Sequence, residues 1–135
     1  MKCVMLINRD LPLGLIANTA AVLAVSLGQK FTDIVGEDLT GPDGSLHPGI
    51  TQLPILILNG DDTSIREIRQ KVIENPQPGL YYVDFCDAAQ QSKVYDEYKQ
   101  RLACTPPEQL HYLGLALCGS NKQIERLTGN IGLLR

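Results

Sequence analysis

Four continuous apolar runs, each about the length of a β-strand, alternate along the chain with stretches whose apolar residues recur at helical spacing. The runs predict buried strands at residues 2–8, 54–58, 80–85 and 112–118. The intervening patterns predict helices at residues 15–27 and 64–74, a helix starting near residue 87 and a short helix at 120–129. Strands that alternate with helices are typical of an α/β fold with a mainly parallel or mixed sheet. The 135 residues contain no linker or internal repeat and predict a single domain, 1–135.

The first predicted helix, residues 15–27, is apolar nearly all round, and its only polar side chains are Asn18, Thr19 and Ser26. A helix without a polar face is buried on two sides. We therefore expect this helix to pack on the sheet and also beneath another helix or a second subunit. Its small residues, which permit a close approach, are Ala17, Ala20, Ala21 and Ala24.

Residues 31–50 carry turn signals instead of a periodic pattern. A short strand is predicted at 31–35, and Gly41-Pro42-Asp43-Gly44 is a strong turn signal. This part of the chain is expected to form an edge hairpin or an ordered excursion.

Composition narrows the function classes. Twelve Lys and Arg against fifteen Asp and Glu leave a formal charge of -3, which is not the clustered basic surface of a nucleic-acid binder. The first apolar run is cut off by Asn8-Arg9-Asp10, so it is too short for a signal peptide or a membrane span. We expect a cytoplasmic protein that has neither nucleic acid nor a membrane as a partner.

The four cysteines lie far apart, with no CxxC pair and no histidine at ligand spacing, so we expect no metal site and no cofactor. Without a signal peptide, reduced thiols in a cytosol are the expectation. Cys86 and Cys118 follow apolar runs and are interpreted as core residues, because a thiolate nucleophile needs a base nearby.

Two segments at opposite ends of the chain resemble one known pattern. The first is the strand, the loop 8–14 and a helix with Ala20-Ala21, and the second is Gly119-Ser120 followed by residues 124–134. Together they resemble the type II peptidyl-tRNA hydrolases of archaea and eukaryotes. The whole chain is similar to an uncharacterised bacterial group on that fold, catalogued as domain of unknown function 2000. That group shares Leu-x-x-Gly-x-x-Ala-Asn after the first strand, Asp-Phe in the third and Leu-Thr-Gly near the end.

The resemblance implies a three-layer α/β/α sandwich, type II peptidyl-tRNA hydrolase-like, with about four strands in a mixed, mainly parallel sheet. It also implies a site between the first helix and the last short helix. In the hydrolases a lysine starts the alanine-rich helix, and Ala17 holds that place here; Glu125 holds the place of their aspartate. Hydrolysis at a tRNA end needs a cation for the phosphodiester, and residues 11–29 contain no Lys or Arg. We expect weak peptidyl-tRNA hydrolysis at most.

Polar residues after the first and fourth strands are the candidate site. Asp10 could orient a ligand or act as a base, or simply bond loop amides as in an Asx turn. Asn18 needs hydrogen-bond partners inside an apolar helix, so it is expected to line a pocket and pin the loop of Asp10. Gly119-Ser120-Asn121-Lys122 offers backbone N–H groups and an ammonium to an anion, although plain capping by Ser120 explains the same residues. Glu125, if it reaches Asp10, would complete an acid/base pair.

The sequence therefore predicts a protein that binds, or acts on, a small polar ligand between its first and last helices. The ligand-binding candidates are Asn8, Asp10, Gly14, Asn18, Ser120 and Lys122. Asp10 and Glu125 are the catalytic candidates, and whether any reaction occurs stays open. The alternatives are a structural or interaction homodimer built on the first helix, and a weak peptidyl-tRNA hydrolase.

Overall fold

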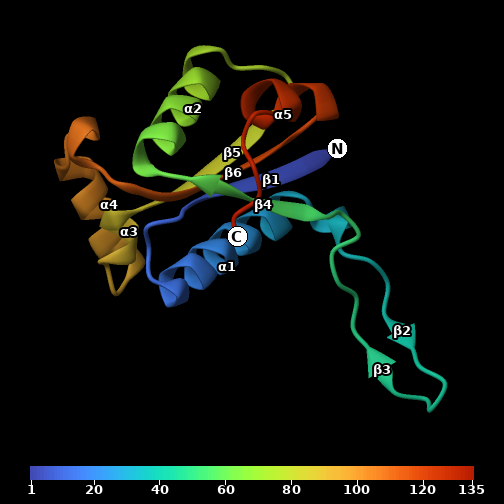
Figure 1. Ribbon diagram of the computed structural model, residues 1–135. Coiled ribbons are helices and arrows are strands. Elements are labelled where there is room, and N and C mark those ends of the chain that lie inside the picture. The colour runs from blue at the N-terminus through green and yellow to red at the C-terminus, as the bar shows by residue number, and fades with distance from the viewer.

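The four apolar runs form one four-stranded sheet in the computed structural model, which describes residues 1–135 (Figure 1). The strands β1 (Lys2–Asn8), β4 (Ile55–Gly60), β5 (Tyr81–Cys86) and β6 (Tyr112–Gly119) lie in the order β4-β1-β6-β5. β1 is parallel to β4, whereas β6 is antiparallel to both β1 and β5. The prediction of a mainly parallel sheet is therefore wrong for two of its three strand pairs.

The direction of β6 follows from the segment that precedes it. Helices α3 (Asp87–Gln90) and α4 (Tyr95–Cys104), with the 3-10 turn Pro107–Gln109, stay at the end of the sheet where β5 finishes. The backbone N–H of Asp87 donates to the carbonyl of His111 at 2.9 Å, so the chain enters β6 beside the point where it left β5. A parallel strand would have required a crossover along a face of the sheet.

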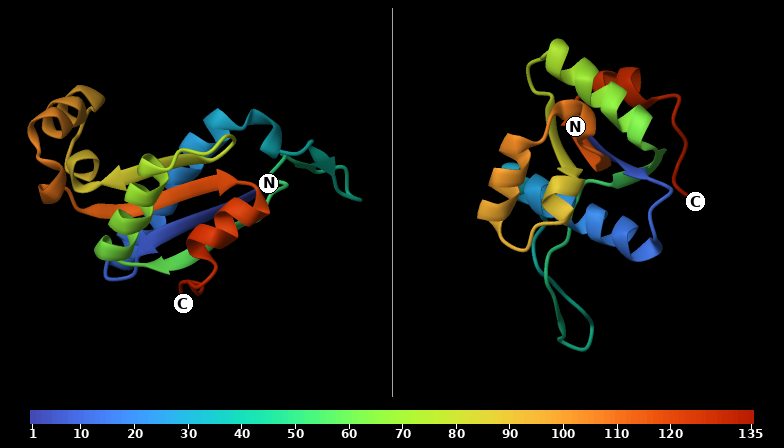
Figure 2. Two further views of the ribbon diagram at one scale, coloured as in Figure 1. Left: turned by 90° about the horizontal axis from the view of Figure 1, so that it is seen from above. Right: turned by 90° about the vertical axis from the view of Figure 1, so that its left-hand side faces the viewer.

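The other helices cover both faces of this sheet, which gives three layers (Figure 2). α1 (Leu13–Lys30) lies on one face, and α2 (Asp62–Glu74) and α5 (Asn121–Thr128) lie on the other. On the α1 face the core includes Ile7, Leu23 and Leu27, and on the opposite face it includes Leu6, Ile65 and Ile124. Because both faces are covered, every residue of β6 is buried.

Two of the helices begin with capping boxes. Ser120 and Gln123 form the box at the start of α5, as predicted. At α2, which was predicted to begin at residue 64, Asp61 is the cap and Ser64 is the third helical residue that completes the box. The carboxylate of Asp61 accepts a free N–H group of the first turn, and α2 therefore starts two residues earlier than expected.

Within the chain α1 is covered on one side only, so the expected second cover is not another helix, and the alternative of a second subunit stays a prediction. Only Thr19, Leu23 and Leu27 are buried, whereas Leu13 is 82% exposed and Val25 75% exposed. Thr19 approaches the sheet closely over Gly114, where an added Cβ would lie 2.6 Å from the Thr19 methyl. No element of the chain covers the outer side of α1. By length and composition alone α1 is able to cross a membrane, but its inner side packs on the sheet as that of an ordinary surface helix does.

Residues 35–52 leave the body as a two-stranded arm (Figures 1 and 2). Its strands are β2 (Leu39–Thr40) and β3 (Leu46–His47), and Val35 pairs with Thr51 at its base. The prediction of a hairpin here is confirmed, but the hairpin is not at an edge of the main sheet. The predicted short strand at 31–35 is instead a 3-10 turn, Thr32–Ile34.

The two edges of the main sheet are treated differently. The C-terminal segment runs along β4, where Asn59 N–H donates to Gly132 at 2.8 Å and Leu134 N–H donates to Ile57 at 3.0 Å. The outer edge of β5 has no such partner. Covering one edge removes a row of backbone groups that would otherwise pair with another chain.

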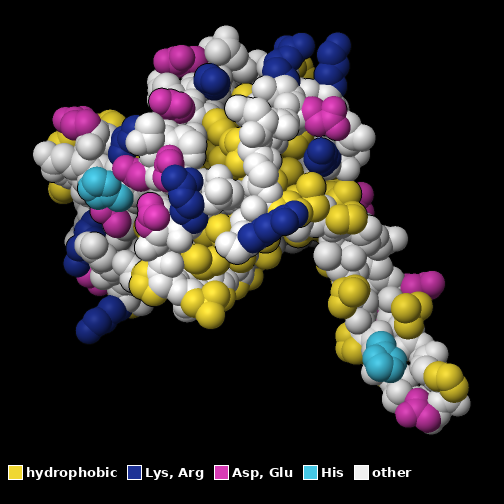
Figure 3. All heavy atoms as spheres, in the orientation of Figure 1, with side chains coloured by type: hydrophobic (Ala, Val, Ile, Leu, Met, Phe, Trp, Pro, Cys, Tyr) yellow, Lys and Arg dark blue, Asp and Glu magenta, His cyan; other side chains and the backbone are white.

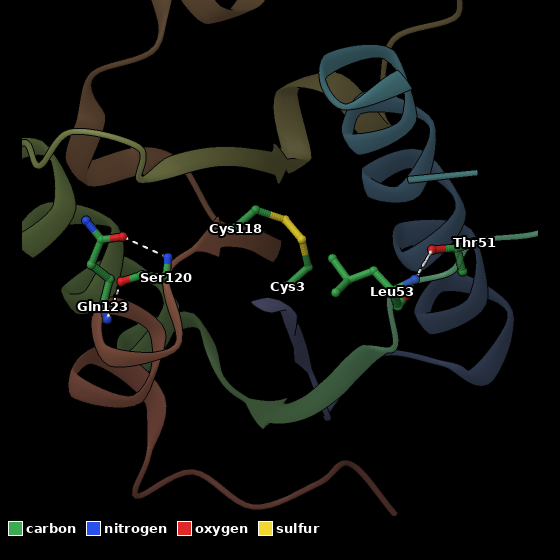
Figure 4. Close-up of a disulfide and its surroundings, with 6 residues drawn as sticks. All are labelled: Cys3, Thr51, Leu53, Cys118, Ser120 and Gln123. Carbon is green, nitrogen blue, oxygen red and sulfur yellow. Dashed lines mark hydrogen bonds between the residues drawn. A yellow bond between two sulfur atoms is a disulfide. The ribbon is translucent and has the colours of Figure 1, made fainter. Parts of the chain in front are cut away.

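Cys3 of β1 and Cys118 of β6 lie opposite each other and form a disulfide (Figure 4). The expectation of four reduced thiols is wrong for this pair, because the antiparallel register brings two residues 115 positions apart in sequence into direct contact. Cys86 and Cys104 are free.

Candidate functional site

The carboxyl ends of β1 and β4 open into a hollow of about 600 Å³, which we call the carboxyl-end hollow. Its walls come from the loop after β1, the first turns of α1, the end of β4 and the C-terminal segment. The lining residues are Arg9, Asp10, Leu13, Ile16, Asn59, Leu133, Leu134 and Arg135. Ligands of open α/β sheets gather at this place, beyond the carboxyl ends of parallel strands.

The loop after β1 is shaped by a tight turn. The side-chain carbonyl of Asn8 accepts the backbone N–H of Asp10 at 3.0 Å, and the backbone carbonyl of Asn8 accepts the N–H of Leu11 at 3.3 Å. This is an Asx turn in which Asn8, not Asp10, supplies the acceptor. The carboxylate of Asp10 accepts no hydrogen bond from the protein and stays available at the rim of the hollow.

Arg9 crosses from this loop to the end of β4. Its backbone N–H donates to Gly60 at 3.0 Å, and its guanidinium contacts the Gly60 carbonyl at 3.4 Å and the Asp61 carboxylate at 3.3 Å. The backbone N–H of Ser64, with smaller effects from its hydroxyl and from Arg9, holds the pKa of Asp61 below its usual value. The guanidinium is therefore positioned over the hollow while part of it stays open to solvent.

The first turn of α1 also faces this end of the sheet. Pro12 precedes the helix, no side chain caps it, and its first turn contains no acidic residue. The first N–H groups of a helix are left without intrahelical partners and carry partial positive charge. For α1 neither a cap nor a carboxylate neutralises them.

The predicted site is divided between the two ends of the sheet. Because β6 is antiparallel to β1, Gly119 pairs with Lys2, so Ser120 and Lys122 lie beside the amino end of β1. Asn8 and Asp10 lie at the other end, about 20 Å away along the strand. Ser120 is occupied in capping α5 (Figure 4). A separate polar hollow of about 250 Å³, lined in part by Lys122 and Arg126, lies there.

Asp10 and Glu125, whose proximity the sequence left open, do not pair. Glu125 lies 3.6 Å from the ammonium of Lys2, at the amino end of β1. In addition, α1 and α5 cover opposite faces of the sheet, so no pocket lies directly between the first and last helices.

The two candidates on α1 lie at different places on the helix. Asn18 is exposed, makes no hydrogen bond and does not line the carboxyl-end hollow, so it neither pins the loop nor forms a pocket wall. The prediction failed because the outer side of α1 faces solvent, where an amide needs no protein partner. Gly14 lies in the first turn of α1, and an added Cβ would meet nothing within 4 Å.

Two polar residues of the hollow, Asn59 and Arg135, were missed in the sequence. Asn59 lies beside Ile7 in the parallel register, and Arg135 is the last residue of the C-terminal segment that runs along β4. The signal for Asn59 was its place at the end of the second buried run, which mirrors the place of Asn8 at the end of the first. No local pattern connected Arg135 with Arg9 across the intervening chain.

A second polar cluster lies under α2. The Arg69 guanidinium donates to the Asp84 carboxylate at 2.7 Å and lies 5.1 Å from the ring centre of Tyr112 and 5.9 Å from that of Tyr82. Burial disfavours the charged form of Arg69, but the hydrogen bond and charge of Asp84 outweigh it and raise the pKa. This pair is satisfied within the protein and anchors α2 to β5.

Cys86 is the buried free thiol, which agrees with its interpretation as a core residue. It pairs with Tyr112 across the β5–β6 ladder, which brings it next to His111 in the backbone. Burial raises the pKa of the Cys86 thiol, and the His111 ring faces Asp62 at 3.3 Å. Burial, with Cys86 and Asp84 nearby, also raises the pKa of Tyr98 to about 12. This arrangement keeps Cys86 protonated and does not activate it as a nucleophile.

No group of three or more His, Cys, Asp and Glu side chains in this structure is arranged to hold a metal ion.

The comparisons with known proteins agree on family and fold. The profile of the family described as "Protein of unknown function (DUF2000)" matches residues 1–135. A solved structure of a protein of unknown function from Agrobacterium tumefaciens is similar over 98% of this chain and 96% of that chain, with a TM-score of 0.86 and 19% sequence identity. No curated protein matches the sequence.

Proposed function

The chain belongs to the DUF2000 family of proteins of unknown function, and we propose that it binds a small polar molecule with an anionic group in the carboxyl-end hollow. The observation that carries this proposal is the meeting of a guanidinium with an uncapped helix start at the ends of two parallel strands. Helix starts of this kind favour carboxylates and phosphates, and Arg9 adds a charge-assisted donor.

The carboxylate of Asp10 narrows the chemistry of the ligand. The carboxylate of Asp10 at the rim would repel an anion that approaches Arg9. This repulsion is offset if the ligand also carries a hydrogen-bond donor for Asp10. Hydroxy acids, amino acids and sugar phosphates combine an anionic group with a neighbouring hydroxyl or ammonium. We propose this class of ligand, with Asn59 as a further hydrogen-bonding group.

A thermal-shift screen with these three ligand classes tests the proposal. A ligand present at a hundred times its Kd stabilises by about 2.7 kcal/mol, which for a chain of this size raises Tm by roughly 8 °C. We expect Arg9→Gln and Asp10→Asn to lose most of the shift. Lys122→Gln, at the opposite end of β1, is the matched control and is expected to retain it.

Two results would contradict this assignment. A compound that shifts Arg9→Gln and Asp10→Asn as much as the wild type binds elsewhere. A shift that instead disappears in Lys122→Gln would assign the ligand to the hollow beside α5.

We further propose that the architecture is that of the type II peptidyl-tRNA hydrolases, which is supported by the three layers, with α1 on one face and α2 and α5 on the other. The activity does not follow. Ala17, at the place of the hydrolase lysine, is exposed, and the only basic residue of α1 is Lys30 in its last turn. We expect no useful release of the acyl group from an N-acylated aminoacyl-tRNA, and a measured turnover would overturn this expectation.

A further inference from the structure

The outer side of α1 is unusual for a surface helix because it carries no charge. From Leu11 to Gln29 there is no Lys, Arg, Asp or Glu, and the exposed positions repeat at helical spacing. Leu13, Ala17, Ala21 and Val25 form one exposed row. A solvent-facing helix normally carries charged residues on this side.

The arm that follows α1 is also apolar and exposed. Its large side chains Val35, Leu39, Leu46 and Ile50 are 50%, 61%, 62% and 80% exposed. Leu39 lies opposite His47 and Leu46 opposite Thr40, so the two leucines point to opposite faces of the hairpin. In Figure 3 hydrophobic side chains are visible along the arm, which projects from the body. Nothing in the same chain covers either face.

The arm is nevertheless an ordered element. Gly36 N–H donates to Ile50 at 2.9 Å, and Gly49 N–H donates to the Asp38 carboxylate at 2.8 Å. The two segments of the arm pass so closely at its base that a Cβ on Gly49 would lie 1.8 Å from the Gly36 carbonyl oxygen. The arm thus has an ordered backbone but buries none of its own side chains. This combination indicates an element that packs against a surface outside the chain.

A groove of about 360 Å³ runs beside α1, along the open edge of β5. Val22 and Ser26 of α1 line one side, and Val94 and Tyr95 line the other. Val94 is 63% exposed and Tyr95 80% exposed. Two charged residues line the groove: Asp84, whose carboxylate is paired with Arg69, and Lys93, which makes no ion pair within the chain.

We propose that a second copy of this chain covers α1, with the α1 helices of two copies packed across a two-fold axis and the arm of each copy lying in the groove of the other. The occupant is a second copy because the surface is self-complementary. A two-fold contact brings each patch against itself, and an uncharged row of small residues meets its counterpart without repulsion.

The charges of the arm support the same partner. Glu37, Asp38 and Asp43 are the only charged residues of the arm, 35–52, which therefore carries -3, and since the whole chain is also -3 the remainder is neutral. An acidic arm fits a groove whose rim carries the unpaired Lys93.

Large exposed apolar side chains of the chain lie on α1, on the arm and in the groove. A stable interface buries about 800 Å² per partner. The large apolar side chains available for it are those of the arm, together with Leu13, Val22 and Val25 of α1 and Val94 and Tyr95 of the groove, and each of them is more than one third exposed. Most of these side chains lie outside α1, so the arm and the groove extend the contact that α1 makes.

Sedimentation velocity over a concentration series tests the proposal. The monomer mass is 14.8 kDa, and the wild type is expected to sediment at twice that mass. Ala21→Arg places a charge at the centre of the helix contact and is expected to sediment as a monomer. Ala103→Arg makes the same change at an exposed helical alanine of α4, away from the groove, and is expected to remain dimeric. Circular dichroism and Tm establish that both variants are folded.

A second variant tests the arm. Leu39→Ser combined with Leu46→Ser keeps the turn and the arm base intact, and we expect it to weaken dimerisation at least tenfold. If this variant dimerises as tightly as the wild type, the placement of the arm in the groove is wrong.

The whole proposal is overturned if the wild type sediments at 14.8 kDa at every concentration, or if Ala21→Arg dimerises as well as Ala103→Arg. A monomeric wild type that pellets with phosphatidylcholine vesicles would assign the outer side of α1 to a lipid surface and would also overturn it. None of these results bears on ligand binding by Arg9 and Asp10, which is measured separately.

Discussion

The four-stranded sheet of the body and the two-stranded arm are built from the same backbone hydrogen bonds, yet they use their side chains in opposite ways. In the body, β1 and β6 bury nearly every side chain between α1 on one face and α2 and α5 on the other. In the arm, Leu39 and Leu46 are both more than half exposed. Hydrogen bonding defines the shape of both regions, but only burial makes the body stable by itself.

The largest effect on the free energy of unfolding is expected from the disulfide. It cross-links two strands of the body, and the arm lies within the loop of chain between the two cysteines. Cys3 and Cys118 are 115 residues apart, and a cross-link over such a loop stabilises by up to about 4.7 kcal/mol in the chain-entropy model. Urea unfolding with and without a reductant measures this loss. Under denaturing, non-reducing conditions we expect two of the four cysteines, Cys86 and Cys104, to react with iodoacetamide. Four reactive thiols would contradict the disulfide.

A matched pair of leucines compares the two regions directly. Leu115 is fully buried at the centre of β6, whereas Leu46 is 62% exposed on the arm. Leu115→Ala leaves a cavity and is expected to cost about 3 kcal/mol. Leu46→Ala is expected to cost less than about 0.5 kcal/mol when measured at a protein concentration low enough to avoid association. Equal losses in urea unfolding would mean that the arm is packed in the free chain.

A matched pair of glycines sharpens the comparison further. A Cβ on Gly114 would lie 2.6 Å from the Thr19 side chain and 3.2 Å from the Leu6 carbonyl, so Gly114→Ala overpacks the core and is expected to cost about 2 kcal/mol. Gly49→Ala is expected to cost less, although its Cβ would lie 1.8 Å from Gly36, because the base of the arm opens without disturbing the body.

Hydrogen exchange measures where the strain of Gly49→Ala goes. We expect the Gly36 N–H, which donates to Ile50, to lose protection while the amides of β6 keep theirs. Loss of protection throughout the sheet would show that arm and body unfold together. Gly14→Ala, at an exposed position with open space around it, is the control.

The smallest effect on stability is expected from replacing two aspartates whose pKa is lowered in the folded protein. A backbone N–H of Ser64 lowers the pKa of Asp61 in the body, and the hydroxyl of Ser45 lowers the pKa of Asp43 in the arm. A lowered pKa stabilises the folded state above the ordinary value of 3.8, and this contribution is lost as the pH falls through the lowered pKa. We expect Asp61→Asn to flatten the decrease of Tm below pH 4 and Asp43→Asn to follow the wild type, since the arm turn is not coupled to unfolding of the body.

The elements were well predicted because their signals are local. The four buried runs became the four strands of the sheet, and the Ser120–Gln123 pattern became the cap of α5. The turn at residues 41–44 became the tip of a hairpin. Each of these depends on residues within a few positions of one another, so periodicity and capping chemistry are sufficient to find them.

The candidate site was predicted only in part. Asp10 and Asn8 lie at the carboxyl end of β1, as a strand followed by polar residues implies. Ser120 and Lys122 lie at the opposite end, because the segment α3–α4 returns the chain beside the end of β5 and reverses β6. Nothing within residues 112–122 records that reversal.

The sequence by itself determined the four buried strands of the sheet and the main helices between them, and it determined that α1 lacks charge from its start to Gln29. Only the tertiary structure decided the direction of β6, the pairing of Cys3 with Cys118 and the exposure of the outer side of α1. The physical reason is the range of the interactions. Helix and strand periodicity arises between neighbours in the chain, whereas register, disulfide pairing and the covering of a helix depend on contacts between segments that meet only after the chain has folded.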